Sequence, residues 1–143
     1  MAQRTIIIRT TPDGPIQKEG IIDAAILPGM CVEYADGTRI QVMSATLDPM
    51  LRVVVDEFDV AVDGTYKSGD LVPFVTPQRG DELYMYATAP ALSTLAATNK
   101  LVSDGAGFLI YCAAPIAGEA VAEVLVGQVI AANTIELVKV EVL

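Results

Sequence analysis

The sequence predicts an all-β fold: a small barrel-like or sandwich-like domain with an extended N-terminal arm and at most one short helix. Three observations support this prediction. Runs rich in β-branched residues recur at spacings of about 8 to 15 residues, as in small barrels and sandwiches. Gly, Pro and Asp residues separate these runs. The chain has 143 residues, of which 52% are hydrophobic, enough for a single core but not for a second full domain.

The chain divides into two parts, an arm with its linker at residues 1–19 and a barrel-like domain at residues 20–143. Each expected strand is a short apolar or alternating run bounded by turn residues. In chain order the expected strands are 4–9, 30–34, 38–43, 51–58, 70–75, 82–87, 101–102, 108–112, 122–131 and 135–142.

Turn residues fix several of these boundaries. Asp36-Gly37 lies between two alternating runs and predicts a hairpin, because Gly tolerates the positive φ of a tight turn. Asp63-Gly64 and the run at 104–107 predict turns in the same way. The last strand alternates apolar and charged residues, with one irregularity at Leu137-Val138 that indicates a bulge.

Two segments have ambiguous patterns. Residues 90–98 begin with Pro and are rich in Ala, so two helical turns are expected there. Residues 118–132 fit both helical and strand periods. Their Val-rich composition and the interior Gly127 favour a strand.

The arm combines one apolar stretch, Ile6-Ile7-Ile8, with a linker in which Pro12 and Pro15 block regular structure. Because the arm has little of its own to pack against, these isoleucines should pair with a sheet edge, in the same subunit or in a neighbour. Arg4 and Arg9 flank them and would meet carboxylates.

Charge is unevenly distributed along the chain. The formal net charge is −9, so the protein should repel phosphate backbones, and nucleic acid is not an expected partner. Residues 1–18 carry +2 and the remainder −11. A basic arm fits docking on an acidic partner, although short terminal arms are often slightly basic by chance.

No apolar run reaches the roughly 18 residues of a membrane-spanning helix, and Arg9 interrupts the first apolar run, so neither a membrane segment nor a signal peptide is expected. The protein should be soluble and intracellular when made. Cys31 and Cys112 lie in apolar, strand-like surroundings and are expected to be reduced core thiols. A disulfide between them stays possible from the sequence alone.

Residues that support catalysis are scarce. The chain has no His, the usual proton-transfer residue near neutral pH. Asp56, Glu57, Asp59 and Asp63 resemble a calcium loop, but the Gly and the terminal Glu of that loop are missing, so a solvated acidic loop is favoured. The run at 79–82 fits a turn better than a carboxylate pair for acid–base chemistry. No phosphate-binding loop or nucleophile elbow is present. We therefore expect no enzyme activity, no cofactor and no bound metal.

Three segments together carry a family resemblance: KEGIIDAAILPGMCVEY (18–34), TYKSGDLVPF (65–74) and PQRGDELY (77–84). Their order and spacing resemble those of tailed-bacteriophage capsid decoration proteins, also called head cement proteins. The endings GQVIA (127–131) and VKVEVL (138–143) are also similar to that family. Where the family has a Gly-Asp-Gly-Thr turn, this chain has SDGAG (103–107), and its arm is more apolar than the resemblance requires.

The resemblance implies a structural virion protein without catalytic activity. Such proteins form a small β-barrel-like body and assemble as trimers at threefold and quasi-threefold positions on the outside of an expanded icosahedral head. The expected partners are the major capsid protein and other copies of the chain, after synthesis in the host cytoplasm. The partner-binding residues hypothesised on the arm are Arg4, Ile6, Ile7, Ile8 and Arg9. A phage tail or baseplate structural module is the alternative, and a small trimeric β-fold hydrolase is a more distant one.

Overall fold

Strands make up the regular secondary structure of this protein, as the sequence predicts. The computed structural model describes residues 6–10, 16–37, 39–44, 51–56, 64–89, 94–115, 120–130 and 134–143. Within them there is no helix, and thus none long and apolar enough to cross a membrane. The strands are β1 (Ile7–Arg9), β2 (Ile16–Ile22), β3 (Val32–Asp36), β4 (Arg39–Val42), β5 (Val53–Val54), β6 (Leu71–Thr76), β7 (Glu82–Thr88), β8 (Thr94–Leu95), β9 (Lys100–Ser103), β10 (Leu109–Tyr111), β11 (Ala122–Val124), β12 (Gln128–Val129) and β13 (Glu136–Val142).

Five strands close into a small barrel in the order β7-β10-β9-β11-β13, with β13 returning to pair with β7. The β13–β7 pairing is antiparallel and continuous from Glu136 opposite Ala87 to Glu141 opposite Glu82. Along β7, exposure alternates between half-buried and buried residues, so one side of the strand points into the barrel. β1 adds to the first half of β7 and β10 to its second half.

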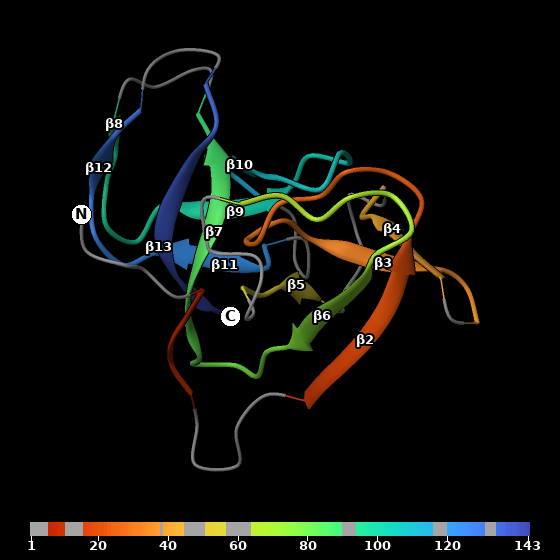
Figure 1. Cartoon of the computed structure of the whole chain (residues 1–143). Helices are drawn as coiled ribbons and strands as arrows, with labels where there is room; N and C mark the ends of the chain where they lie inside the picture. Colours follow the sequence, from red (N-terminus) through yellow and green to blue (C-terminus); the bar gives the residue numbers. More distant parts are fainter. Residues whose placement is uncertain are drawn as a thin grey trace.

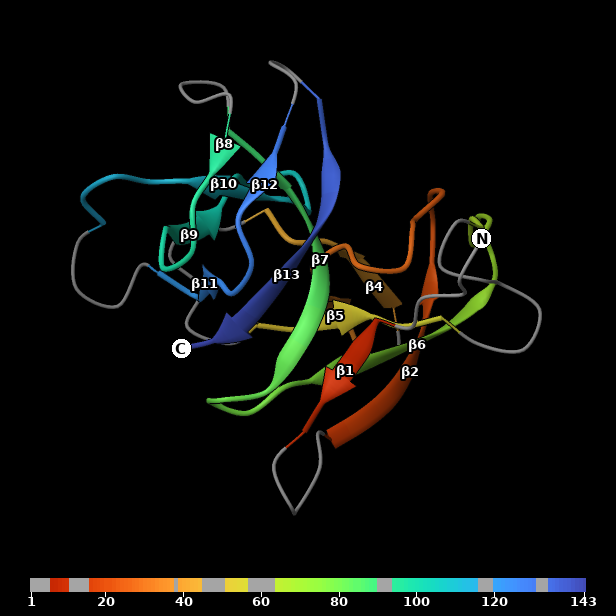
Figure 2. The same ribbon diagram turned by 90° about the vertical axis from the view of Figure 1, so that its left-hand side faces the viewer.

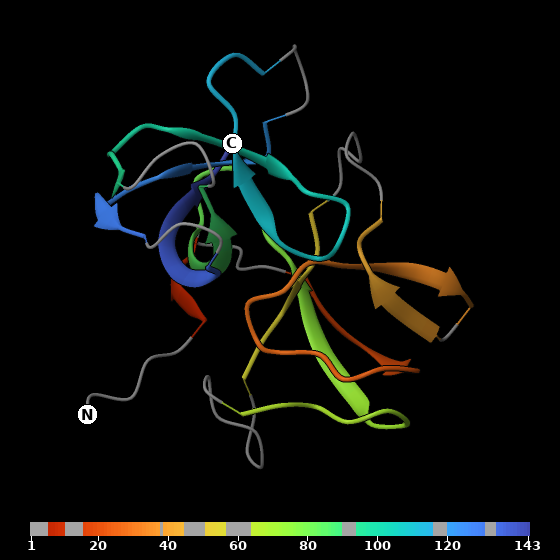
Figure 3. The ribbon, with the colours of Figure 1, turned by 90° about the horizontal axis from the view of Figure 1, so that it is seen from above.

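A second sheet has the order β3-β4-β2-β6-β5 and lies beside the barrel (Figures 1 and 2). Viewed from above, the β3–β4 hairpin is at the far side from the barrel (Figure 3). β2 pairs in parallel with β4 and antiparallel with β6. An isolated bridge between Cys31 and Val53 connects the two outer strands of this sheet.

Strand β5 separates two hydrophobic cores. Val53 and Val55 belong to the barrel core, whereas Val54 belongs to the core of the second sheet. In β6, Val75 and Phe74 divide in the same way. Successive side chains of a strand point to opposite faces, so a run of consecutive apolar residues can serve both cores.

The short helix expected over 90–98 is not found in the described part of that segment. Thr94 and Leu95 form β8 instead and pair with β12. A tight turn follows, in which the N–H of Asn99 donates to the carbonyl of Ala96 at 3.1 Å. Tertiary pairing with a strand 33 residues away overrides the local preference of these alanines and the leading Pro.

Two further expectations about the C-terminal strands were wrong. Residues 122–131 do not form one strand: β11 ends at Val124 and β12 begins at Gln128 in a different sheet. β13 contains no bulge in its pairing with β7. Leu137 lies on the opposite side of β13 from Val138 and packs close to Gly29, which lies between β2 and β3. Both residues are therefore in apolar surroundings, which explains why two adjacent apolar residues occur in an otherwise alternating strand.

The boundary expected at residue 19 falls inside β2. Gln17, Lys18 and Glu19 are exposed charged or polar residues in that strand, so its hydrophobic pattern is weak. All of β2 up to Ile21 nevertheless pairs continuously with β6. Residues 16–19 therefore belong to the second sheet and not to a linker.

Four turns share one hydrogen-bonding pattern. They are Leu27-Pro28-Gly29-Met30, Lys67-Ser68-Gly69-Asp70, Gln78-Arg79-Gly80-Asp81 and Ala96-Ala97-Thr98-Asn99. In each, the N–H of the fourth residue donates to the carbonyl of the first, and the third residue has a positive φ. This is the type II turn, which favours Gly at its third position. In three of them the side chain of the closing Asp or Asn also accepts the N–H of the first residue at 2.8 Å.

Candidate interaction surfaces

The arm residues named from the sequence lie partly in the protein's own body. Ile6 is fully buried in the barrel core and Ile7 is half-buried against it. Ile8 is exposed. Arg4 lies outside the described residues, and of Arg9 only the backbone is described, at the end of β1. Of these five residues, Ile8 is the one whose described side chain is open to a partner.

The arm joins the barrel through backbone and side-chain contacts. β1 pairs antiparallel with β7, with Ile7 opposite Leu83. The N–H of Tyr84 donates to the carbonyl of Ile6 at 2.8 Å, and the N–H of Ile6 donates to Oδ1 of Asp56 at 3.0 Å. The sheet edge expected for the arm is thus found within the same chain.

The acidic segment that resembled a calcium loop is described only in part. Asp56 accepts the hydrogen bond from Ile6, whereas Glu57, Asp59 and Asp63 lie outside the described residues. Within the described ranges, no group of three or more Cys, Asp or Glu side chains could hold a metal ion. The visible role of Asp56 is to fix the start of β1 on the body.

The segment at 79–82 has the structural role that its turn pattern indicated. Asp81 is buried, and its carboxylate accepts the N–H of Gln78 at 2.8 Å. Its own carbonyl accepts the N–H of Val142 at 2.9 Å. A buried carboxylate with backbone donors stabilises the chain path between β6 and β7.

The thiols differ in their surroundings, and both are free. Cys31 is buried between the sheets, and burial, together with the charge of Asp104, raises the pKa of its thiol strongly. Cys112 is only half-buried, so the expectation that both would lie in the core holds for Cys31 alone.

Two glycines form the joint between the barrel and the second sheet. The carbonyl of Gly107 accepts the N–H of Cys31 at 2.8 Å, and the N–H of Gly107 donates to the carbonyl of Met43 at 3.2 Å. Gly29 donates to Val54 at 2.8 Å and accepts from Tyr86 at 3.1 Å. Gly29 belongs to a segment that carries the family resemblance and Gly107 to the turn at 103–107 that departs from it, and both glycines hydrogen-bond across the two units.

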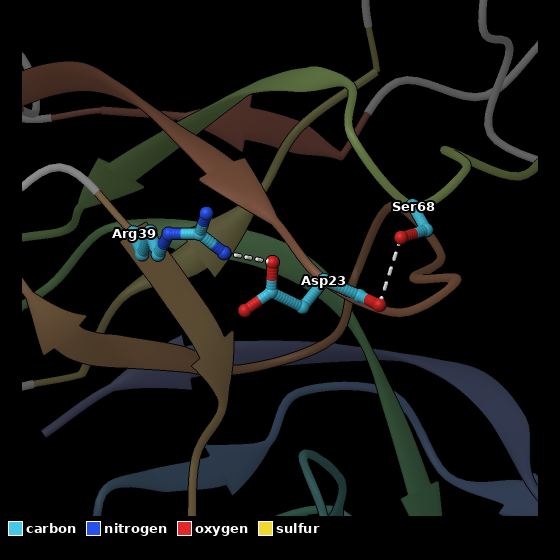
Figure 4. Close-up of polar contacts among 3 residues, drawn as sticks. All are labelled: Asp23, Arg39 and Ser68. Atoms are coloured by element: carbon cyan, nitrogen blue, oxygen red, sulfur yellow. Dashed lines mark hydrogen bonds and ion pairs between the residues drawn. The ribbon is translucent and has the colours of Figure 1, made fainter.

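Polar contacts also order the far end of the second sheet (Figure 4). Arg39 of β4 forms an ion pair with the carboxylate of Asp23, which follows β2. The hydroxyl of Ser68 donates to the backbone carbonyl of Asp23 at 2.8 Å. Next to these contacts, Ile21 and Leu71 are opposite each other in the β2–β6 pairing and are both exposed.

A second polar cluster lies at the start of β3, next to the end of β4. Oε1 of Glu33 accepts hydrogen bonds from the backbone and hydroxyl of Ser44 and from Nε2 of Gln41. Partial burial raises the pKa of Glu33, but these hydrogen bonds and the charge of Arg52 outweigh it, so the pKa lies below its ordinary value. The Arg52 guanidinium stacks 5.0 Å from the centre of the Tyr34 ring.

The exposed apolar residues were not identified from the sequence. Besides Ile8, the described surface exposes Ile21, Tyr34, Leu71, Val126, Val129, Ile135 and Leu143. Their local patterns are those of ordinary strand residues. The exposure of each depends on whether another element covers it, which is a property of the tertiary structure.

The described polar clusters therefore provide hydrogen bonds and ion pairs that hold turns and strands. Comparison with known protein families gives no match to any family model. Comparison with curated proteins likewise gives no match to this chain.

Proposed function

We propose that the protein is a capsid decoration protein that binds the outer surface of an expanded icosahedral bacteriophage head and stabilises it. It would bind as a trimer at threefold and quasi-threefold positions, with the major capsid protein as its partner and the virion surface as its location. The observation that carries the proposal is the ordered resemblance of residues 18–34, 65–74 and 77–84 to head cement proteins.

The positions of these segments support the proposal. Each contains one of the type II turns, at 27–30, 67–70 and 78–81. The turn at 27–30 contains Gly29, which hydrogen-bonds to both units, and the turn at 78–81 joins β6 to β7, whereas the turn at 67–70 leads into β6 within the second sheet.

The physical demands on a cement protein also agree with the chain. Such a protein contributes binding free energy across neighbouring capsid subunits, which requires contact area and several simultaneous contacts but no reactive group. A net charge of −9 keeps the protein from binding the packaged genome. On the arm, Ile8 together with Arg4 and Arg9 is the proposed contact with the capsid.

The decisive experiment mixes the purified full chain with expanded, undecorated heads of its own virus and images them by electron cryomicroscopy. Added density at threefold positions, and heads that survive heating better than bare heads, are expected. Heads without added density would overturn the proposal. Density on isolated tails alone would favour the tail or baseplate alternative, and a substrate-saturable hydrolysis would favour the hydrolase.

A pair of matched variants tests the contact assigned to the arm. Ile8 and Ile21 are exposed to 36% and 38%, on the barrel side and on the second sheet respectively. Ile8→Asp should weaken head binding by about tenfold or more, whereas Ile21→Asp should leave it unchanged. Equal binding by Ile8→Asp and the unaltered chain, or a loss confined to Ile21→Asp, would exclude the arm as the contact.

A further inference from the structure

The structure gives very different surroundings to two copies of the same dipeptide, Asp36-Gly37 and Asp104-Gly105. In an Asp-Gly pair the amide nitrogen of the glycine can attack Cγ of the aspartate, because glycine has no side chain to hinder the approach. Whether the attack occurs in a folded protein depends on how firmly the two groups are held. The other Asp-Gly pairs of this chain, at 13–14 and 63–64, include residues outside the described ranges.

The reaction is a condensation followed by a hydrolysis. A bond forms between the glycine nitrogen and Cγ, and the hydroxyl of the protonated carboxyl group leaves as water with the proton of the glycine N–H. Water then opens the cyclic imide. When it cleaves the bond between the nitrogen and the main-chain carbonyl carbon, the main chain runs through Cγ and the residue becomes isoaspartate. No cofactor, oxidant or second protein takes part in either step.

Both reacting groups are free at the first pair. Asp36 and Gly37 are exposed at the turn of the β3–β4 hairpin. Within the described part of the chain, neither the carboxylate of Asp36 nor the N–H of Gly37 has a hydrogen-bond partner. A Cβ added to Gly37 would meet no atom within 4 Å. The nitrogen and the carboxyl group can therefore approach each other without displacing a neighbour.

Both reacting groups are held at the second pair. Oδ1 of Asp104 accepts the N–H of Ala106 at 2.7 Å and the N–H of Phe108 at 3.1 Å. The N–H of Gly105 donates to Oγ of the buried Ser103 at 3.2 Å. The attack at this pair must first break these hydrogen bonds, so it should be slower by about tenfold or more.

We infer that Asp36 is a site of spontaneous isoaspartate formation, whereas the fold protects the same dipeptide at 104–105. The local sequences, Ala-Asp-Gly-Thr and Ser-Asp-Gly-Ala, both place small residues around the pair, so the difference arises from the hydrogen bonds. The reaction needs no virion partner and is independent of the proposed function.

Isoaspartate at position 36 would change the end of the second sheet. The modified residue adds one methylene group to the main chain, and Asp36 is paired with Arg39 of β4. Arg39 also forms the ion pair with Asp23 (Figure 4). The modification should therefore loosen the β3–β4 pairing and this ion pair, and the modified protein should unfold at a lower temperature.

The test stores the purified full chain at physiological temperature in a mildly acidic buffer, because the carboxyl group loses its hydroxyl in the protonated form. Samples taken over several weeks are digested, and isoaspartate in each Asp-Gly peptide is quantified by liquid chromatography and electron-transfer mass spectrometry. Isoaspartate should accumulate at position 36 about tenfold faster than at position 104. Equal rates, or a faster reaction at 104, would overturn the inference.

A parallel sample in guanidinium chloride separates the fold from the local sequence. Without the fold, the two pairs should react at similar rates. If position 104 stays much slower than position 36 in the denaturant, its neighbours in the sequence protect it and the hydrogen bonds do not.

Gly37→Ala is the matched control for the site itself. Gly37 has no φ in the left-handed region and has open space around the added carbon, so this variant should fold like the unaltered chain. Its methyl group hinders the attack, so isoaspartate at 36, and the fall in unfolding temperature on storage, should decrease by about tenfold. Storage that lowers the unfolding temperature equally in Gly37→Ala would exclude Asp36 as the cause.

Ser103→Ala tests the protection of the second pair. It removes the acceptor of the Gly105 N–H, so isoaspartate at 104 should form about threefold faster or more than in the unaltered chain. The rate at 36 should stay unchanged, which also shows that the variant has kept its fold around the hairpin. An unchanged rate at 104 would contradict the protective role of this hydrogen bond.

Discussion

The barrel and the second sheet differ in how their strands are joined and in which side chains fill their cores. The barrel closes through six consecutive residue pairs between β13 and β7, and its core consists mainly of aliphatic side chains. In the second sheet, the residue before β3 meets β5 through the isolated Cys31–Val53 bridge, beside which the N–H of Val32 donates to the carbonyl of Arg52 and the N–H of Val54 to the carbonyl of Met30. Its smaller core surrounds Phe74, which meets the ring of Tyr34 edge-on, and Tyr66, whose hydroxyl donates to the carbonyl of Val55 at 2.8 Å.

This difference shows where each unit is sensitive to change. In the barrel, stabilisation is shared among many small side chains and a continuous hydrogen-bond ladder. In the second sheet, a few large residues and the turns that join the two units contribute a greater part. Single substitutions should therefore have unequal effects in the two units.

The largest effect is expected for Phe74→Ala in the second sheet. The fully buried ring leaves a cavity that so small a core cannot refill, so the free energy of unfolding should fall by about 3 to 5 kcal/mol. Val140→Ala in the barrel core should cost about 2 kcal/mol. Urea denaturation followed by circular dichroism measures both, and equal losses would show that the two units do not differ in this way.

Ile6→Ala tests whether the arm is part of the barrel. Because the Ile6 side chain is fully buried in the barrel core, its truncation should destabilise the protein by about 2 to 5 kcal/mol. Ile8→Ala, at an exposed position two residues further along the arm, should change stability by no more than about 0.5 kcal/mol. If Ile6→Ala unfolds at the same urea concentration as the unaltered chain, β1 does not stabilise the body.

Gly107→Ala tests the joint between the two units. Gly107 has a φ of 88°, and an added Cβ would lie 3.0 Å from Cε of Met30 and 3.1 Å from Cβ of Val42. Backbone strain and crowding together should cost about 2 to 3 kcal/mol. The control is Gly69→Ala, which has a similar φ of 92° but open space around the added carbon, so about 1 kcal/mol of backbone strain is expected. A smaller loss for Gly107→Ala than for Gly69→Ala in thermal unfolding would argue against a tight joint.

The smallest expected effect concerns Glu33 at the rim of the second sheet. Its pKa is lower in the folded protein than its ordinary value of 4.5, so its ionised form stabilises the fold. That contribution is fully present above the ordinary pKa and is lost as the pH falls through the lower folded value. Glu33→Gln should therefore be less stable than the unaltered chain at pH 7, and this difference should shrink towards pH 3. A difference in urea midpoint that is the same at both pH values would contradict the assignment.

Local sequence patterns determined much of the fold. Alternation in the segment of β13 identified one buried face, that of Val138, Val140 and Val142, since side chains two positions apart share one face of a strand. Asp36-Gly37 correctly located the β3–β4 hairpin, although Gly37 does not have the positive φ on which that prediction was based. These features depend on neighbouring residues, so the sequence alone was enough to predict them.

Only the tertiary structure decided the features that depend on distant segments. β2 was not recognised as a strand because several of its residues are polar and exposed, and its partner β6 lies about 50 residues further along the chain. Residues 94 and 95 form strand β8, where a helix was expected, because they pair with β12. Ile6 is buried in the barrel core and Ile8 is exposed, although residues two positions apart usually share a face, and the pairing of β1 with β7 shifts register between Ile7 and Arg9. Val126 and Val129 belong to a run with the same apolar pattern as core strands, and they are exposed because no described element packs over them. Hydrogen bonds between distant segments, and the burial of their side chains, depend on how the whole chain packs, so local propensity cannot predict them.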